Sequence, residues 1–340
     1  MQRSLRWSRP STRASSILGV AAVALAASAA LVNRRAARAE HDYLPRGRFV
    51  TADGVRLHYI EMGKGPPVIF LHGNGSMVED MLISGVMHQA AAAYRAISFD
   101  RPGFGYSERP QQRSWTAAAQ AALFARAFAQ LGIGSPIVVG HSWGTLVALT
   151  LALNHPGSVS GLVLASGYYF PTARTDVAIF SPPSLPLLGD VISYTVAPII
   201  GEFIGWPLIA KMFAPQSVSP KFQREFPMAL ALRPSQIKAF SQDTAHMLAA
   251  AQQLSPRYAS IKCPTVIMAG DADRIVDIER QAQRLHGTIP GSRLDVFSGA
   301  GHMIHHLDPG RIVKAIDLIA TGGITRASMQ AEAQTWGTTT

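Results

Sequence analysis

The sequence has almost no cysteine and few charged side chains. A single cysteine, Cys263, among 340 residues excludes an internal disulfide framework and any zinc site built wholly from cysteine. Only 15% of the residues are charged whereas 48% are hydrophobic, so the chain can bury a sizeable core and is not disordered throughout. We interpret Cys263, in K-C-P-T-V-I-M, as a small buried thiol at the entry to a strand. The length allows one large domain with an insertion, or two domains.

Acidic residues are also scarce, and the resulting net charge of +10 is unevenly distributed. Residues 1–48 hold nine arginines but only two acidic residues, Glu40 and Asp42. The rest of the chain carries 22 basic and 19 acidic side chains. A basic groove that could neutralise several phosphates is therefore not indicated, and we expect no nucleic-acid partner.

Residues 1–46 form a basic leader around a charge-free apolar run at residues 14–33. The run is close to the ~20 residues needed to span a bilayer. Three outcomes stay open: an uncleaved transmembrane anchor, which we favour, a signal peptide cleaved near Ala37-Arg38-Ala39, and a soluble alanine-rich helix. Arginines flank the run on both sides, so the side of the membrane is undecided. We therefore predict a membrane-anchored or exported protein.

From residue 47 to about 321, short apolar runs alternate with helical stretches. A hairpin is predicted around Asp53-Gly54. Further strands are predicted at residues 68–71, 94–100, 137–139, 161–165, 265–269 and 293–297. Apolar strands separated by helices predict an α/β fold with a doubly wound, mostly parallel sheet covered on both faces. Residues 322–340 are expected to form a polar tail.

The alternation is interrupted between residues 168 and 257, where prolines are dense and large apolar residues lie between them. A structureless loop of this length is improbable in a compact domain, so we predict a helical insertion. An insertion at the carboxyl edge of such a sheet lies over the ligand crevice as a cap. The alternative is a peripheral subdomain.

The motif G-H-S-W-G occupies residues 140–144, between a predicted strand and a predicted helix. In that context G-x-S-x-G predicts a sharp turn that exposes Ser142 as a nucleophile. The same turn aims the backbone N–H of Trp143 at negative charge that develops beside the serine. An ordinary turn is the alternative.

A serine hydroxyl needs a base, and the base needs a carboxylate to hold it. His302, in G-A-G-H after the last predicted strand, would lie at the same sheet edge as Ser142; a structural loop histidine is the alternative. His286, His305 and His306 are placed elsewhere. Asp271 and Asp273 both follow the strand at 265–269. We prefer Asp273, and we expect Asp271 to be a turn residue bonded to its own backbone.

A second donor for a developing oxyanion is expected after the strand at 68–71, in H-G-N-G. We select the backbone N–H of Asn74, since the neighbouring glycines allow a substrate to approach closely. His72 is interpreted as a residue that holds this loop. Asn74-Gly75-Ser76 also matches a glycosylation sequon, which we discount in such a loop.

Taken together, H-G-N-G, D-R-P-G-F-G-Y-S (residues 100–107), G-H-S-W-G, G-D-A-D and G-A-G-H, in this order, resemble the α/β-hydrolase superfamily in its lipase- and esterase-like branch with a lid. The resemblance covers residues 47–321. It implies Ser142 as nucleophile, His302 as base and Asp273 as orienting acid, with Asn74 and Trp143 as oxyanion donors. Asp100 and Arg101 are expected to be structural. Haloalkane dehalogenases and epoxide hydrolases of this fold use aspartate at the elbow, so serine disfavours both activities.

We therefore predict a serine hydrolase that cleaves an ester-like bond of a lipophilic small molecule, without metal or organic cofactor. An acyltransferase, a C–C bond hydrolase and a cofactor-free haloperoxidase would use the same three residues. A non-catalytic binding protein is disfavoured, because such proteins usually lose a member of the triad.

Overall fold

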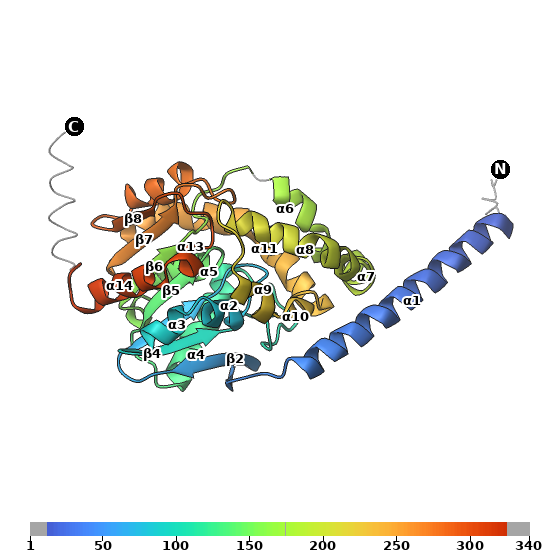
Figure 1. Ribbon diagram of the computed structural model, residues 1–340, viewed down its shortest axis with the longest axis horizontal. Helices are drawn as coiled ribbons and strands as arrows, with labels where there is room; N and C mark the ends of the chain where they lie inside the picture. The colour runs from blue at the N-terminus through green and yellow to red at the C-terminus, as the bar shows by residue number, and fades with distance from the viewer. Residues whose placement is uncertain (1–11, 174, 325–340) are drawn as a thin grey trace, which may run out of the picture.

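The computed structural model describes residues 12–173 and 175–324, and an eight-stranded sheet lies at its centre (Figure 1). The strand order is β1-β2-β4-β3-β5-β6-β7-β8. Pairs β1/β2 and β2/β4 are antiparallel, and every pair from β4 to β8 is parallel. The bounds are β1 Arg48–Ala52, β2 Val55–Met62, β3 Pro67–Leu71, β4 Arg95–Phe99, β5 Ile137–His141, β6 Gly161–Ala165, β7 Thr265–Gly270 and β8 Arg293–Phe297. The predicted doubly wound, mostly parallel α/β sheet is confirmed.

The first two strands form the predicted hairpin, in which Ala52 pairs with Val55. Its two turn residues, Asp53 and Gly54, have φ angles of +54° and +74°. Positive φ at both central positions matches the right-handed twist of the flanking strands, and Asp-Gly supplies it at low cost.

Both faces of the sheet are buried, and alternate side chains of one strand serve opposite layers. In β3, Val68 and Phe70 pack with α2, α3 and α14, whereas Ile69 and Leu71 pack with α4 and α5; all four are fully buried. Apart from the N-terminal helix, the α-helices outside the cap are α2 Val78–Ile83, α3 Val86–Ala90, α4 Ala117–Gln130, α5 Gly144–Asn154, α12 Arg284–His286, α13 Ile304–Leu307 and α14 Pro309–Ala320.

A helical cap is inserted between β6 and β7, as the fold prediction requires (Figure 1). Its helices are α6 Thr175–Phe180, α7 Leu188–Thr195, α8 Ala197–Phe213, α9 Pro220–Glu225, α10 Met228–Ala231 and α11 Pro234–Leu254. Helices α7 and α8 are joined by a bend of 64°. The last of these helices, α11, returns from the cap to the core, where Ala251 and Leu254 are buried.

The expected N-terminal apolar helix is present as α1, Thr12–Asp42, and it projects away from the sheet in Figure 1. Within the described residues, its segment Gly19–Asp42 is the one unbroken helix long and apolar enough to cross a bilayer. Only 6% of its most apolar stretch is buried in the protein. Residues 1–11 of the predicted leader and residues 325–340 of the predicted tail lie outside the described residues.

The second half of α1 packs against the cap rather than the sheet. Ser28 Oγ donates a hydrogen bond of 2.8 Å to the carbonyl oxygen of Thr195, at the end of α7. Val32 and Ala39 are each only 2% exposed. Two ion pairs complete the contact, Arg35–Glu202 at 2.5 Å and Arg233–Glu40 at 2.7 Å.

Candidate active site

Ser142 lies between β5 and α5 in a backbone conformation that few non-glycine residues adopt. Its φ is +51°, in the left-handed region. Its N–H donates to the carbonyl oxygen of Ala165 at 2.9 Å, and its carbonyl oxygen accepts from Thr145 Oγ1 at 2.6 Å. These bonds hold the turn in a conformation that costs about 1–2 kcal/mol for an L-residue, and such strain is concentrated at functional sites.

The two glycines of the motif are required by neighbouring backbone. A Cβ on Gly140 would lie 2.8 Å from the Cα of Thr145. A Cβ on Gly144 would lie 2.3 Å from the carbonyl oxygen of Leu71. Only glycine therefore allows the helix to start this close to β3, and the sharp turn at Ser142 depends on that approach.

Replacing Gly144 by alanine should destabilise the fold by about 1–3 kcal/mol, because neither backbone can move away without disturbing the sheet. Urea denaturation followed by circular dichroism would measure the loss. Gly134→Ala is the matched control, since no heavy atom lies within 4 Å of its added Cβ. Equal stability of the two variants would contradict the packing argument.

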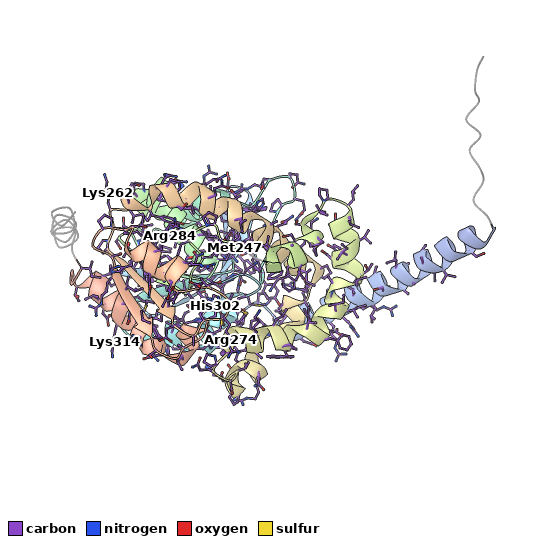
Figure 2. The ribbon with its side chains drawn as sticks, turned by 90° about the horizontal axis from the view of Figure 1, so that it is seen from above. Met247, Lys262, Arg274, Arg284, His302 and Lys314 are labelled. Atoms are coloured by element: carbon purple, nitrogen blue, oxygen red, sulfur yellow. The ribbon has the colours of Figure 1, made fainter. Side chains whose placement is uncertain are left out.

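His302 and Asp273 meet at the carboxyl edge of the sheet, in the loops after β8 and β7. Nδ1 of His302 lies 2.7 Å from Oδ2 of Asp273, and their side chains are 1% and 2% exposed. The other oxygen of Asp273 accepts the N–H groups of Ile275 and Val276 at 2.7 and 3.1 Å. Figure 2 shows His302 near the middle of the molecule, inward of exposed side chains such as Lys314. The carboxylate is thus fixed by its own loop and faces the imidazole.

Asp271 takes a different role from the one expected. Its Oδ1 accepts the N–H of Gly299 at 2.6 Å, so it ties the β7 loop to the loop after β8 instead of bonding its own backbone. The prediction was wrong because the backbone N–H of an adjacent strand's loop is close enough to compete with local turn groups. Asp271 therefore braces the loop that carries His302.

The elbow and the His302 loop are in contact. Nε2 of His141, the residue before Ser142, lies 3.2 Å from the carbonyl oxygen of His302, and the two imidazole rings are 5.1 Å apart between centroids. Within the described residues, no hydrogen bond joins Ser142 Oγ to His302. The two residues therefore lie at the same edge of the sheet but are not hydrogen-bonded to each other. Hydrogen bonds between nucleophile and base are often long before substrate binds, so this spacing is compatible with a catalytic pair.

The side chains of the two expected oxyanion donors are engaged elsewhere, which leaves only their backbone for that role. Nδ2 of Asn74 donates to the carbonyl oxygen of Phe240 at 3.1 Å and to Thr244 Oγ1 at 2.9 Å, both on α11. Trp143 is 1% exposed, and its indole N–H donates to the carbonyl oxygen of Asp243 at 2.9 Å. Gly73 brings the loop close to the serine, since a Cβ there would lie 3.2 Å from the Cβ of Ser142.

A buried guanidinium supports this loop from below. Nε and Nη2 of Arg101 donate to the carbonyl oxygens of His72 and Gly73 at 2.9 and 3.0 Å. Its backbone N–H donates to Nε2 of His72 at 2.9 Å. Burial lowers the pKa of His72 to about 4, so this ring is a neutral acceptor at neutral pH. Arg101 also lies 4.5 Å from the centroid of the Trp143 ring.

The counter-ion of Arg101 is Asp243, a residue that no motif in the sequence indicates. Asp243 is on α11 and is fully buried. It pairs with Arg101, and its Oδ1 accepts from Arg109 at 2.9 Å and from Gln120 at 3.2 Å. No motif surrounds Asp243 in the sequence, so only the folded cap identifies it as a partner of the loop beneath the site.

Asp100, the neighbour of Arg101, organises the turn D-R-P-G-F-G-Y-S. Its carboxylate accepts from His58 Nδ1 at 2.7 Å, from the N–H of Val78 at 2.8 Å and from the N–H of Tyr106 at 2.9 Å. These three donors come from β2, from the start of α2 and from the turn itself, and Asp100 is fully buried. Asp100 therefore anchors the segments that meet at this turn, in agreement with its expected structural role.

The loop that carries His302 is bonded to the cap. The N–H of His302 donates to the carbonyl oxygen of Met212 in α8 at 3.1 Å. The side-chain amide of Gln216 donates to the carbonyl oxygen of Gly299 at 2.8 Å and accepts the N–H of Gly301 at 3.0 Å. The position of the imidazole thus depends on the end of α8.

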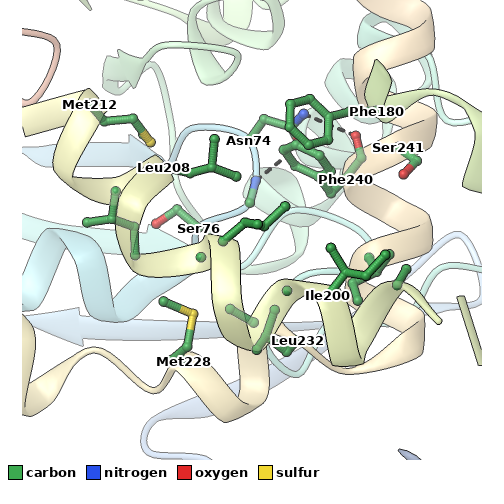
Figure 3. Close-up of a pocket in the computed structure, with 18 of the residues that line it drawn as sticks. Asn74, Ser76, Phe180, Ile200, Leu208, Met212, Met228, Leu232, Phe240 and Ser241 are labelled. Carbon is green, nitrogen blue, oxygen red and sulfur yellow. Dashed lines mark hydrogen bonds between the residues drawn. The ribbon is translucent and has the colours of Figure 1, made fainter. Parts of the chain in front are cut away.

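A cavity of about 440 Å³ opens between the cap and the loop at residues 74–76 (Figure 3). It adjoins the site through Asn74 and Met303, the residue after His302. No charged side chain lines it among the described residues. The apolar lining comes mainly from α8, with contributions from α6, α10 and α11, and includes Phe180, Ile200, Leu208, Met212, Leu232 and Phe240. Its chemistry suits a lipophilic group.

One buried cluster has the composition of a metal site. Nε2 of His305 and of His306 lie 3.2 and 2.6 Å from the same oxygen of Asp80, and the three ligand atoms lie within 4.8 Å of one another. Hydrogen bonds already join these groups. The cluster does not include Asp273, the carboxylate that faces His302. His305 nevertheless packs against His141, the residue before Ser142, with ring centroids 4.3 Å apart, so it lies closer to the elbow than the sequence indicated.

Comparisons with known proteins agree with this architecture. The chain is 29% identical over 262 residues to 2-hydroxymuconate semialdehyde hydrolase from Pseudomonas putida, covering 75% of this chain and 87% of that protein. It is 26% identical over 270 residues to haloalkane dehalogenase 2 from Mycobacterium bovis, covering 77% and 90%. A crystal structure of a bacterial membrane phospholipase A superposes with a TM-score of 0.63 at 21% identity, covering 91% of this chain and 96% of that one.

The family model described as alpha/beta hydrolase family matches residues 68–315, which include every strand from β3 to β8 and the loops that carry Ser142, Asp273 and His302. That match spans most of the chain. The chain therefore belongs to the alpha/beta hydrolase family and is a hydrolase.

Proposed function

We propose that this hydrolase cleaves a carboxylic ester of a lipophilic molecule through an acyl-enzyme on Ser142, with His302 as base and Asp273 as orienting acid. The observation that carries the proposal is the buried 2.7 Å contact between His302 and Asp273 at the sheet edge where Ser142 stands. A carboxylate on Nδ1 leaves Nε2 free to exchange a proton and stabilises the imidazolium.

The reaction then follows from these positions. Ser142 Oγ attacks the ester carbonyl while His302 takes its proton, and the backbone N–H groups of Asn74 and Trp143 stabilise the oxyanion. His302 passes the proton to the departing alcohol. Water, activated by the same imidazole, attacks the acyl-enzyme and releases the acid. Each step needs only protein groups and water.

The cavity supports a lipophilic ester over an anionic substrate. Its lining carries no charged side chain among the described residues, so a substrate carboxylate would lose its hydration without gaining a cation. The relative from Pseudomonas putida is named for a semialdehyde of a muconate, which is such an anion. The haloalkane dehalogenase relative belongs to a class whose elbow carries aspartate, whereas this chain carries Ser142.

Asp273→Asn should lower kcat by about 10⁴-fold with little change in fold, because an amide that donates to Nδ1 fixes the wrong tautomer of His302. Steady-state assays with an activated ester would measure the change in kcat. Asp271→Asn is the matched control from the same loop; its bond to Gly299 needs only an acceptor oxygen, which asparagine retains. Equal loss in both variants would argue that the loop, and not the tautomer, matters.

We also propose that α1 stays attached and anchors the protein in a membrane. Cleavage after Ala39 would remove the bond from Ser28 to the cap and the Arg35–Glu202 ion pair. It would also expose the surface that Val32 covers. A helix with these contacts acts as part of the folded domain. Intact mass of the membrane fraction would report a retained leader.

The test of the activity is a panel of p-nitrophenyl esters from acetyl to palmitoyl, run beside a vinylogous 1,5-diketone acid and a halide-oxidation assay. We expect the highest kcat/KM for esters with medium or long acyl chains. We expect no turnover of the diketone acid and no halide oxidation. Turnover of the diketone alone would overturn the ester proposal in favour of a C–C bond hydrolase. Added alcohols separate hydrolysis from acyl transfer by the products formed.

A further inference from the structure

Exposed apolar side chains gather where α7 meets α8, a region that we call the α7–α8 corner (residues 187–204). Leu187 is 82% exposed and Phe203 is 76% exposed. Four further residues are each about half exposed: Leu188 and Val191 on α7, Val196 between the two helices, and Ile200 on α8. Monomeric soluble proteins rarely expose so many large apolar groups together, and such patches mark contact with a partner or a membrane.

The acidic groups in this corner are already paired. Asp190 binds Lys238 of α11, and Glu202 binds Arg35 of α1 at 2.5 Å. Pairing lowers the cost of bringing a charge near an apolar medium. Tyr194 is 41% exposed, and tyrosine is enriched where membrane and water meet.

The contacts of α1 set the depth of the corner. The charge-free run ends at Asn33, and Arg34 and Arg35 follow it. These arginines would lie at the headgroup level of a spanning helix. Ser28 precedes Arg35 by seven residues, which places it about 10 Å further along the helix axis, within the hydrocarbon. Since Ser28 bonds the end of α7, that end lies at the same depth.

We propose that the α7–α8 corner is inserted in the lipid leaflet next to Arg34 and Arg35. The occupant of this face is the acyl-chain region of the bilayer. Helices at interfaces bury their apolar face about 5–10 Å into the headgroup and acyl boundary, which agrees with the depth that the Ser28 contact gives. The inference rests on the proposed attachment of α1.

Insertion also gives the site a route for its substrate. Ile192, Val196, Ile200 and Ile204 belong to the corner and at the same time line the cavity that adjoins Asn74. The inner side of the corner is therefore cavity wall and its outer side is lipid-facing. A lipophilic ester can enter from the leaflet without crossing water. We therefore narrow the proposed substrate class to esters that are dissolved in the membrane or that form it.

The experiment uses the full-length protein in phosphatidylcholine vesicles at low protein-to-lipid ratio. An environment-sensitive NBD dye is attached at Leu187→Cys or Phe203→Cys in a Cys263→Ser background. Neither position lines the cavity. Val296→Cys is the control, because Val296 is 37% exposed on β8, at the opposite end of the sheet from α1 (Figure 1).

We expect blue-shifted emission at 187 and 203, and loss of intensity there when the lipid acyl chains are brominated, with neither effect at 296. Emission at 187 and 203 that matches 296 would overturn the proposal. A blue shift without quenching by brominated lipid would also overturn it, because a second copy of the chain would then cover the corner. The readout does not depend on turnover, so failure of the ester assay leaves it unaffected.

Discussion

Ser142→Ala should lower kcat/KM for an activated ester by at least about 10⁴-fold, the largest activity effect expected for this protein. Without Oγ no acyl-enzyme can form, and His302 and Asp273 have no alcohol to activate. The residual rate would come from water held near the backbone N–H groups of Asn74 and Trp143. The fold should persist, since alanine removes one oxygen from a half-buried position. Steady-state kinetics and covalent labelling by a fluorophosphonate would measure the effect.

Ser166→Ala provides a matched control for that experiment. Ser166 follows β6 as Ser142 follows β5, and its φ of +47° is nearly the same. Its Oγ is buried without a hydrogen-bond partner in the described structure. We expect Ser166→Ala to keep its activity and its label. If Ser142→Ala hydrolysed esters within tenfold of the parent and still reacted with the fluorophosphonate, the nucleophile would be a different residue.

Asp243→Ala should give the largest loss of stability, about 3–5 kcal/mol, because it leaves the guanidinium of Arg101 buried without a counter-ion. Arg101 and Asp243 are both fully buried, so water cannot replace the lost carboxylate. Activity should fall as well, since Arg101 holds the carbonyl oxygens of His72 and Gly73 beneath the site. Urea denaturation monitored by tryptophan fluorescence would measure the change.

Glu108→Ala controls for the loss of an ordinary ion pair. The side chains of Glu108 and its partner Arg56 are each about half exposed, and Nε of Arg56 lies 3.9 Å from Oε1 of Glu108. Oε2 of Glu108 also accepts the backbone N–H of Arg56 at 3.1 Å. Exposed pairs contribute 0–1 kcal/mol. If Asp243→Ala does not accumulate, Asp243→Asn keeps the shape and some hydrogen bonds and should show a smaller loss of the same sign. An Asp243→Ala protein as stable as Glu108→Ala would refute the role assigned to the buried pair.

The sheet could be predicted from the sequence because its signals are local. Apolar runs at residues 68–71 and 265–269 are too short for helices and are bounded by glycine or proline, and both are strands. The turn at Asp53-Gly54 carries its own backbone preference. The approach of His302 to Asp273 could be anticipated for a related reason: parallel strands deliver their carboxyl ends to one edge.

The remaining features depend on contacts between distant segments. Asp243 lies in an insertion whose proline-rich sequence gives no periodicity strong enough to say which helix face meets Arg101. Aspartate is common in turns where its side chain bonds to its own backbone, so residue type alone misplaces Asp271. Only the register of β7 and β8 brings the N–H of Gly299 within reach of its carboxylate. The contact of Ser28 with Thr195 joins residues 167 positions apart. No local pattern encodes such pairings.

The bond from the N–H of His302 to the carbonyl oxygen of Met212 bears on attempts to engineer this enzyme. The acceptor is a main-chain atom, so replacing the side chain at position 212 does not remove it. Libraries that vary that side chain to change selectivity would therefore leave the imidazole of His302 in position. Exchanging the whole cap for that of a relative is different. A chimera whose transplanted helix ends one turn early would present no acceptor there, and its turnover would suffer even if its new binding cavity were well formed.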